Sequence, residues 1–199
     1  MTVYHVKSTL ITNLDALVTP FLVLRGTSGE GASGRIKEIS GYVTETASAG
    51  IDSTHQLARV PSTAKIKEIL LNSISQGTTG IYDLGVYYAT DNLSALSVTK
   101  GTIQLAANAI DQDFFAASAL DAGGNVAWYI GTPGLGVLGL ATTFSLAASA
   151  WTAAKANQPL WQAAGLSADP GGNLDIVLTN TEAAGTGAAN IGFSIKFIA

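Results

Sequence analysis

Two segments near the end of the chain alternate apolar and polar positions with a period of two. The first places Leu174, Ile176 and Leu178 on one face, with Asp175 and Thr179 on the other. The second places Ile191, Phe193, Ile195 and Phe197 on one face, opposite Gly192, Ser194 and Lys196. Because successive side chains leave a strand on opposite sides, both segments are predicted to be half-buried β-strands. The glycine-containing link between them, residues 181–189, favours an antiparallel pair.

Further short segments with strand character occur upstream, separated by turns rich in glycine. They predict strands over residues 42–46, 56–60, 65–75, 81–89, 126–130 and 138–146. Many short strands with few helices indicate an all-β fold, an antiparallel sandwich of two sheets.

Two short helices are expected beside the strands. Asp111 precedes the run DFFAASAL (residues 113–120) and Asp113 begins it, where acids at a helix start would satisfy free amides and the helix dipole. A one-turn helix containing Trp161 is predicted between Pro159 and Gly165, which are typical start and stop residues.

The N-terminal quarter differs from the rest and predicts a division of the chain at residue 50. Residues 1–50 show no strong alternation, contain the flexible sequence TSGEGASG, and carry an apolar stretch from Ala16 to Leu24. We expect an extended N-terminal arm and linker over residues 1–50 and the β-sandwich domain over residues 51–199. An apolar segment outside the sandwich is expected to pack on a neighbouring subunit.

Four stretches together resemble a family of virion proteins of tailed bacteriophages, the capsid decoration or cement proteins. They are LARVPSTAKIKEILLNSIS (57–75), GTTGIYDLGVYYATD (77–91), DQDFFAASALDAGG (111–124) and PLWQAAGLSADPGGNLDIVLT (159–179), followed by the final alternating strand. The resemblance spans roughly residues 55–198 and rests on the order and spacing of the parts. It implies a jelly-roll sandwich and a protein on the capsid exterior, made in the bacterial host cytoplasm. It also implies a homotrimer that binds between subunits of the major capsid protein and has no catalytic step.

Charge is sparse and unevenly distributed. Charged residues are 12% of the chain and apolar residues 47%, a composition that fits a compact β protein rich in small residues and also a surface largely covered by partners. Residues 1–67 hold seven basic and five acidic side chains, whereas residues 68–199 hold three and nine. The basic N-terminal third suits an acidic shell. We expect contacts to capsid or subunit from Lys7, Phe21, Leu22, Leu24, Arg25, Arg35 and Lys37.

The residue types needed for most site chemistry are scarce, and we predict no metal, cofactor or catalytic residue. The chain has no cysteine, which excludes thiolate ligands and nucleophiles, and His5 and His55 are its only imidazoles. We expect His55 to face solvent or a neighbour at a strand edge. A net charge of −4 argues against nucleic acid as a partner. The spacing after Asp111 also lacks the residues of a calcium loop.

Two glycine motifs and one uncharged stretch are expected to have no special function. Residues 134–139 match G-x-G-x-x-G but lack the strand–helix context of a dinucleotide site. Residues 29–35 have phosphate-loop spacing, with Arg35 and Ile36 where lysine and a hydroxyl residue are required. Residues 122–154 carry no charge, but glycines and Pro133 interrupt them, so we expect buried strands and no membrane span. The start of the chain shows no secretory signal pattern.

The aromatic residues leave one alternative function open. Trp128, Trp151 and Trp161, with Tyr82, Tyr87, Tyr88 and Tyr129, could line a sugar platform in a glycan-binding or fibre-like module. For Trp161, packing in the core is the simpler interpretation. A hydrolase has little support, because a triad or zinc site would depend on His55 almost alone.

Overall fold

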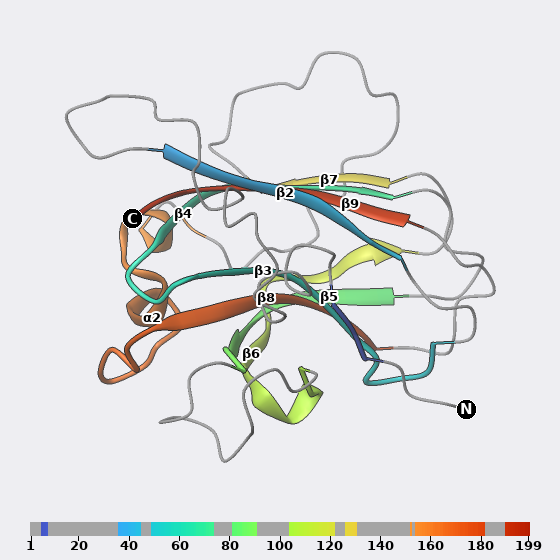
Figure 1. Cartoon of the computed structure of the whole chain (residues 1–199), viewed down its shortest axis with the longest axis horizontal. Coiled ribbons are helices and arrows are strands. Elements are labelled where there is room, and N and C mark those ends of the chain that lie inside the picture. The colour runs from blue at the N-terminus through green and yellow to red at the C-terminus, as the bar shows by residue number, and fades with distance from the viewer. Residues whose placement is uncertain are drawn as a thin grey trace, which may run out of the picture.

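The protein is an open β-sandwich of two stacked sheets (Figure 1). A computed structural model describes residues 5–7, 36–44, 49–73, 81–90, 104–121, 126–130, 152, 154–181 and 190–199. The predicted strand over 138–146, the glycine motifs at 29–35 and 134–139, and Trp151 lie outside these residues. No helix within the described ranges is long and apolar enough to span a membrane.

Within the described residues, one sheet has five strands and the other has four. The five-stranded sheet has the order β1 (His5–Lys7), β3 (Thr54–Pro61), β8 (Asn173–Asn180), β5 (Ile81–Tyr88) and β6 (Ala109–Asp121). The four-stranded sheet has the order β2 (Ile36–Thr44), β9 (Asn190–Ile198), β4 (Lys65–Ser73) and β7 (Val126–Ile130). Every pair is antiparallel except β1 with β3, which is parallel.

The pairing of strands β2 to β9 is nested, and it defines a jelly roll. The outermost strands along the chain, β2 and β9, pair in one sheet, and the next, β3 and β8, pair in the other. The pairs β4–β7 and β5–β6 then continue this alternation between the sheets. The arrangement is that of a long hairpin rolled into two layers. The predicted all-β sandwich is therefore confirmed.

The core lies between the sheets and is filled from both by the alternating apolar positions. Ile191, Phe193, Ile195 and Phe197 of β9 are all buried, as their period-two pattern predicts. Phe193 pairs across the strands with Gly41, where an added Cβ would lie 3.1 Å from the Phe193 ring. Gly41 therefore leaves room for this ring to lie over β2.

Strand β8 departs from the half-buried expectation, because its polar side is buried too. Leu174, Ile176 and Leu178 belong to the core between the sheets. Asp175 and Thr179 alternate with them, so they lie on the outer face of the five-stranded sheet, yet both are fully buried. This outer face therefore holds polar groups that are shielded from solvent.

Residues 113–120 form part of strand β6, so the predicted helix with Asp111 and Asp113 at its start is wrong. The backbone of β6 passes directly over β5 at Gly85, where a Cβ would lie 2.2 Å from the carbonyl oxygen of Gln112. The register between β5 and β6 shifts on both sides of this position. Pairing with a distant strand overrides the local helix signal.

The one-turn helix after Pro159 is confirmed as α2 (Leu160–Ala163). Its first amides are satisfied by the turn between β3 and β4: Leu160 N donates to Ala64 O at 2.8 Å and Trp161 N to Ser62 O at 3.1 Å. Leu160 is fully buried, and Trp161 packs against the core while partly exposed. Two single-turn 3₁₀ helices, η2 (Ala106–Asn108) and η3 (Lys155–Asn157), complete the described helices.

Two segments within residues 1–50 are strands that pair with strands of the sandwich. Strand β2 pairs with β9 over its full length, and it begins six residues before the predicted strand at 42–46. The three residues of β1 pair with β3. The division of the chain at residue 50 stays a prediction, because residues 8–35 lie outside the described ranges.

We expect Phe193→Ala to lower the free energy of unfolding by about 3–5 kcal/mol, because it empties a large buried volume next to Gly41. Ser194→Ala, on the opposite face of the same strand, should cost less than about 1 kcal/mol. Urea unfolding of both variants measures the two losses. Equal losses would mean that the inward face of β9 is misassigned.

Candidate functional site

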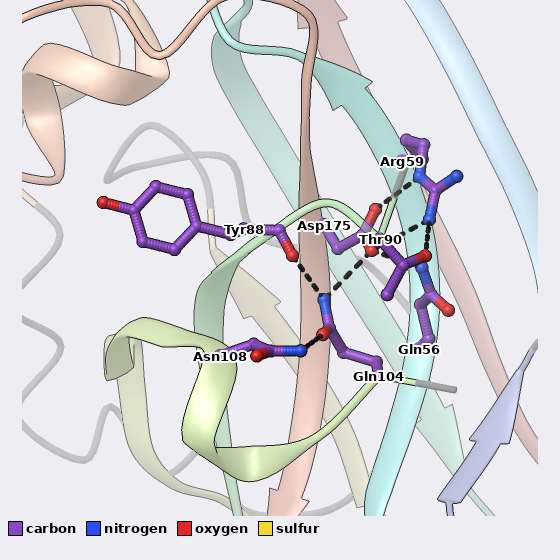
Figure 2. Close-up of polar contacts among 7 residues, drawn as sticks. All are labelled: Gln56, Arg59, Tyr88, Thr90, Gln104, Asn108 and Asp175. Atoms are coloured by element: carbon purple, nitrogen blue, oxygen red, sulfur yellow. Dashed lines mark hydrogen bonds and ion pairs between the residues drawn. The ribbon is translucent and has the colours of Figure 1, made fainter. Parts of the chain in front are cut away.

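A buried polar cluster on the outer face of the five-stranded sheet is centred on Asp175 of β8 (Figure 2). The Asp175 carboxylate accepts hydrogen bonds from Arg59 Nε at 2.7 Å and Arg59 Nη2 at 3.1 Å. It also accepts hydrogen bonds from Gln104 Nε2 at 3.0 Å and from Gln56 Nε2. Asp175 is 0% exposed and Arg59 is 4% exposed. Arg59 lies opposite Asp175 in the β3–β8 register, which brings the two charges together.

A second layer of hydrogen bonds ties this ion pair to the segments that flank β5 and β6. Arg59 Nη2 donates to Thr90 Oγ1 at 2.6 Å, and Gln104 Nε2 donates to the carbonyl oxygen of Tyr88 at 2.7 Å. Asn108 Nδ2 donates to Gln104 Oε1 at 2.8 Å (Figure 2). The cluster therefore joins β3, β8, the end of β5 and η2, elements far apart in the sequence.

The chemistry of this cluster is structural. A carboxylate that takes part in catalysis needs an accessible oxygen, whereas Asp175 is enclosed by four donors and has no exposed surface. Charges buried in this way persist only when they are paired and hydrogen-bonded, as they are here. Sequence reasoning missed this cluster. The available signal was an aspartate in the middle of a strand, where acids are depleted.

His55 is buried, so the prediction that it faces solvent or a strand edge is wrong. Its position in β3 is opposite Leu178, on the core side, and its exposed fraction is 0%. The imidazole meets the Tyr82 ring edge to face, with centroids 5.5 Å apart and planes at 82°. His55 therefore packs as a core aromatic residue.

The pKa values of Tyr87 and Asp111 are raised. Burial raises the pKa of Tyr87 to about 12, although its hydrogen bond with Thr179 lowers it and the charges of Asp83 and Asp52 raise it further. The Tyr87 hydroxyl and Thr179 Oγ1 are 2.5 Å apart. Burial is the largest cause that raises the pKa of Asp111. The side-chain hydrogen bond with Asp113 and the negative charge of Asp113 raise it further. Among the described residues, no group of three or more histidines and acids could hold a metal ion.

Two of the aromatic residues proposed as a sugar platform, Tyr82 and Tyr87, are fully buried and cannot contribute to one. Trp161 and Tyr88 pack against the core while partly exposed. The side chains of Trp128 and Tyr129 lie outside the described part of the structure.

The outer face of the four-stranded sheet is partly accessible and carries paired polar side chains, with the partly buried Leu70 and Ile198 among them. Its side chains pair across the strands: Ser194 Oγ donates to Glu38 Oε1 at 2.7 Å, Lys196 Nζ to Glu68 Oε1 at 2.8 Å, and Thr44 Oγ1 to Asn190 Oδ1 at 2.7 Å. Tyr42 and Ile36 of β2 project from the same face, 53% and 47% exposed. This face is available for contact with another molecule.

Two of the predicted contact residues fall on described strands at one edge of the sandwich. Lys7 ends β1 and Lys37 is the second residue of β2, and these two strands contact each other. The remaining predicted contacts, Phe21, Leu22, Leu24, Arg25 and Arg35, lie outside the described residues.

Comparison with known proteins finds likeness in structure only. No protein-family model matches the sequence, and no curated protein matches it. The structure is similar to a chain of the cyanophage Pam1 capsid asymmetric unit, with 14% identity and a TM-score of 0.43, over 91% of this chain and 97% of that one. It is also similar to a chain of the Ralstonia phage GP4 capsid, with 12% identity and a TM-score of 0.49, over 87% of this chain and 90% of that one. Such values do not assign a family or a function.

The costs of removing the two members of the buried ion pair should not add, because the two side chains depend on each other. We expect Asp175→Asn or Arg59→Met to cost about 3–5 kcal/mol each, because either leaves a buried group without its charged partner. The double variant should cost at least about 1 kcal/mol less than the two single costs together. Urea unfolding of the four proteins measures this coupling, and additive costs would contradict it.

Stability should fall at alkaline pH because of Tyr87. Its folded pKa of about 12 lies above the value of about 10 for an unfolded tyrosine, so the folded state holds this proton to higher pH. The contribution of this proton to the free energy of unfolding is complete below pH ~10. It is lost at up to about 1.4 kcal/mol per pH unit as the pH rises towards 12. Tyr87→Phe should remove this part of the slope in chemical unfolding followed across this range. An unchanged slope would show that Tyr87 does not cause the loss.

Proposed function

We propose that this protein is a structural component of a tailed-phage virion that decorates or cements the capsid. It binds on the capsid exterior between subunits of the major capsid protein, acts as a homotrimer, and stabilises the head by burying surface. It takes part in no catalytic step.

The observation that carries this proposal is that the segments resembling decoration proteins meet one another in the fold. Arg59, in the stretch 57–75, pairs with Asp175, in the stretch 159–179. The same two stretches join where α2 docks on the turn at Ser62 and Ala64. The resemblance therefore concerns a set of residues that builds one folded unit, and not separate stretches of similar composition.

The fold suits binding by interface burial. A rigid sandwich with a polar cluster on one side binds without first ordering its chain, which lowers the entropic cost of association. Specific interfaces bury about 1,600 Å² in total, and apolar area contributes about 25 cal/mol per Å² before that cost is subtracted. Repeated over a shell, modest contacts of this kind would resist internal pressure.

The proposed contact region is the edge of the sandwich where β1 and β2 lie, together with the arm that connects them. Lys7 and Lys37 bring positive charge to this edge, and Arg25 and Arg35 add more along the chain between the two strands. Phe21, Leu22 and Leu24 supply the apolar surface. Basic residues of this kind complement an acidic shell and make binding sensitive to salt.

Deletion of residues 1–25 should leave a folded sandwich that binds capsids and self-associates much less well than the full chain. The measurement is co-sedimentation with purified heads of the phage that encodes the protein, with oligomeric state determined by light scattering. Normal binding by the folded truncated protein would place the contact surface elsewhere.

A charge reversal tests the same region without removing a strand. Lys37→Glu should weaken capsid binding and reduce its salt dependence, because it replaces a favourable charge at the proposed edge. Lys65→Glu, at the start of β4, is the matched control and should bind as the wild type does. If the wild-type protein itself does not sediment with heads or appear on them in electron micrographs, the proposed function is wrong.

A further inference from the structure

An exposed aromatic side chain stands on the outer face of the four-stranded sheet, opposite a glycine of the neighbouring strand. Tyr42 of β2 is 53% exposed, and its cross-strand neighbour on β9 is Gly192, which has no side chain. Gly192 therefore leaves a flat strip of backbone next to the phenol ring. Tyrosine so placed offers an apolar ring and a hydroxyl to a ligand at a small cost in conformational entropy.

Hydrogen-bonding side chains lie on both sides of this strip. Towards the end of β2, Thr44 and Asn190 form one cross-strand pair, and in the other direction Glu38 and Ser194 form a second. Each pair uses one bond to hold its side chains in place. The Asn190 amide still carries two N–H donors, and the Glu38 carboxylate has a second oxygen. Donors and acceptors thus flank an aromatic centre.

The surroundings favour a carbohydrate over a protein surface. Protein interfaces bury a contiguous apolar centre. The other large exposed apolar residue of this strand, Ile36, is six residues from Tyr42, roughly 20 Å along β2. The nearby charges of Lys196 and Glu68 cancel in an ion pair, so the Glu38 carboxylate is the charge that faces the strip, and it disfavours an anionic ligand. A sugar ring has an apolar face for stacking and a rim of hydroxyls for the flanking groups.

We propose that the strip around Tyr42 and Gly192 binds a neutral carbohydrate. The sugar ring stacks on Tyr42 over Gly192, and its hydroxyls bond Asn190 on one side and Glu38 and Ser194 on the other. This site uses none of the aromatic residues that the sequence suggested for a sugar platform. It does not depend on capsid binding, which is assigned to the edge formed by β1 and β2.

The test is a titration of the isotope-labelled full-length protein with maltohexaose, cellohexaose and chitohexaose, followed by amide chemical shifts. At least one of these saccharides should shift the amides of Gly192 and Asn190 at concentrations up to about 10 mM. Tyr42→Ala should weaken that binding about tenfold, as expected for loss of an aromatic contact, and Tyr42→Trp should retain it. Ile36→Ala, on the same face of the same strand, is the matched control and should bind as the wild type does.

Tyr42 and Ile36 are exposed, so their variants should unfold at the wild-type urea concentration, which separates a binding defect from a folding defect. Glu38→Gln should weaken binding severalfold, because a carboxylate accepts a stronger hydrogen bond from a sugar hydroxyl than an amide does. Two outcomes would each overturn the proposal: no amide shift with any of the saccharides, or equal binding by Tyr42→Ala and the wild type.

Discussion

The ion pair between Arg59 and Asp175 is the constraint on which the rest of the five-stranded sheet depends. A carboxylate buried in the middle of a strand is tolerated only where enough donors surround it. Satisfying Asp175 requires Arg59 and Gln56 of β3 and Gln104 from the segment before β6. That requirement favours one register between β3 and β8, since a one-residue slip would turn Asp175 into the apolar core. The hydrogen bonds of Gln104 to Asp175 and to Asn108 also hold η2 against the outer face of the sheet.

The two sheets consequently have different outer faces. The five-stranded sheet is buried on both sides, with apolar residues inward and the Asp175 cluster outward. The four-stranded sheet is buried only on its inner side and presents paired polar side chains and Tyr42 on the other. The outer face of the five-stranded sheet therefore contributes to stability, whereas the outer face of the four-stranded sheet can be reached by other molecules. Both proposed contact regions, the β1–β2 edge and the strip at Tyr42, include residues of β2, the end strand of the accessible sheet.

Errors in the sequence predictions share one physical origin. Residues 111–120 carry local helix signals, and β6 is nevertheless a strand, because its backbone packs over Gly85 of β5. His55 carries no local sign of burial, and the β3–β8 register places it in the core against Tyr82. In the same way, β2 shows too little alternation to be assigned beyond residues 42–46, and its full length follows from pairing with β9. In each case a distant partner decides the outcome.

The sequence by itself determined the class of fold and the faces of its regular strands, because a period of two is a local property that any half-buried strand must satisfy. It therefore placed β9, β4, β5 and α2 and identified the inward positions of Phe193 and Phe197. Only the tertiary structure decided the nested strand order, the burial of β8 on both sides and the assembly of the Asp175 cluster. These features depend on which distant segments meet, and the free energy of a buried charge is set by neighbours that local sequence does not specify.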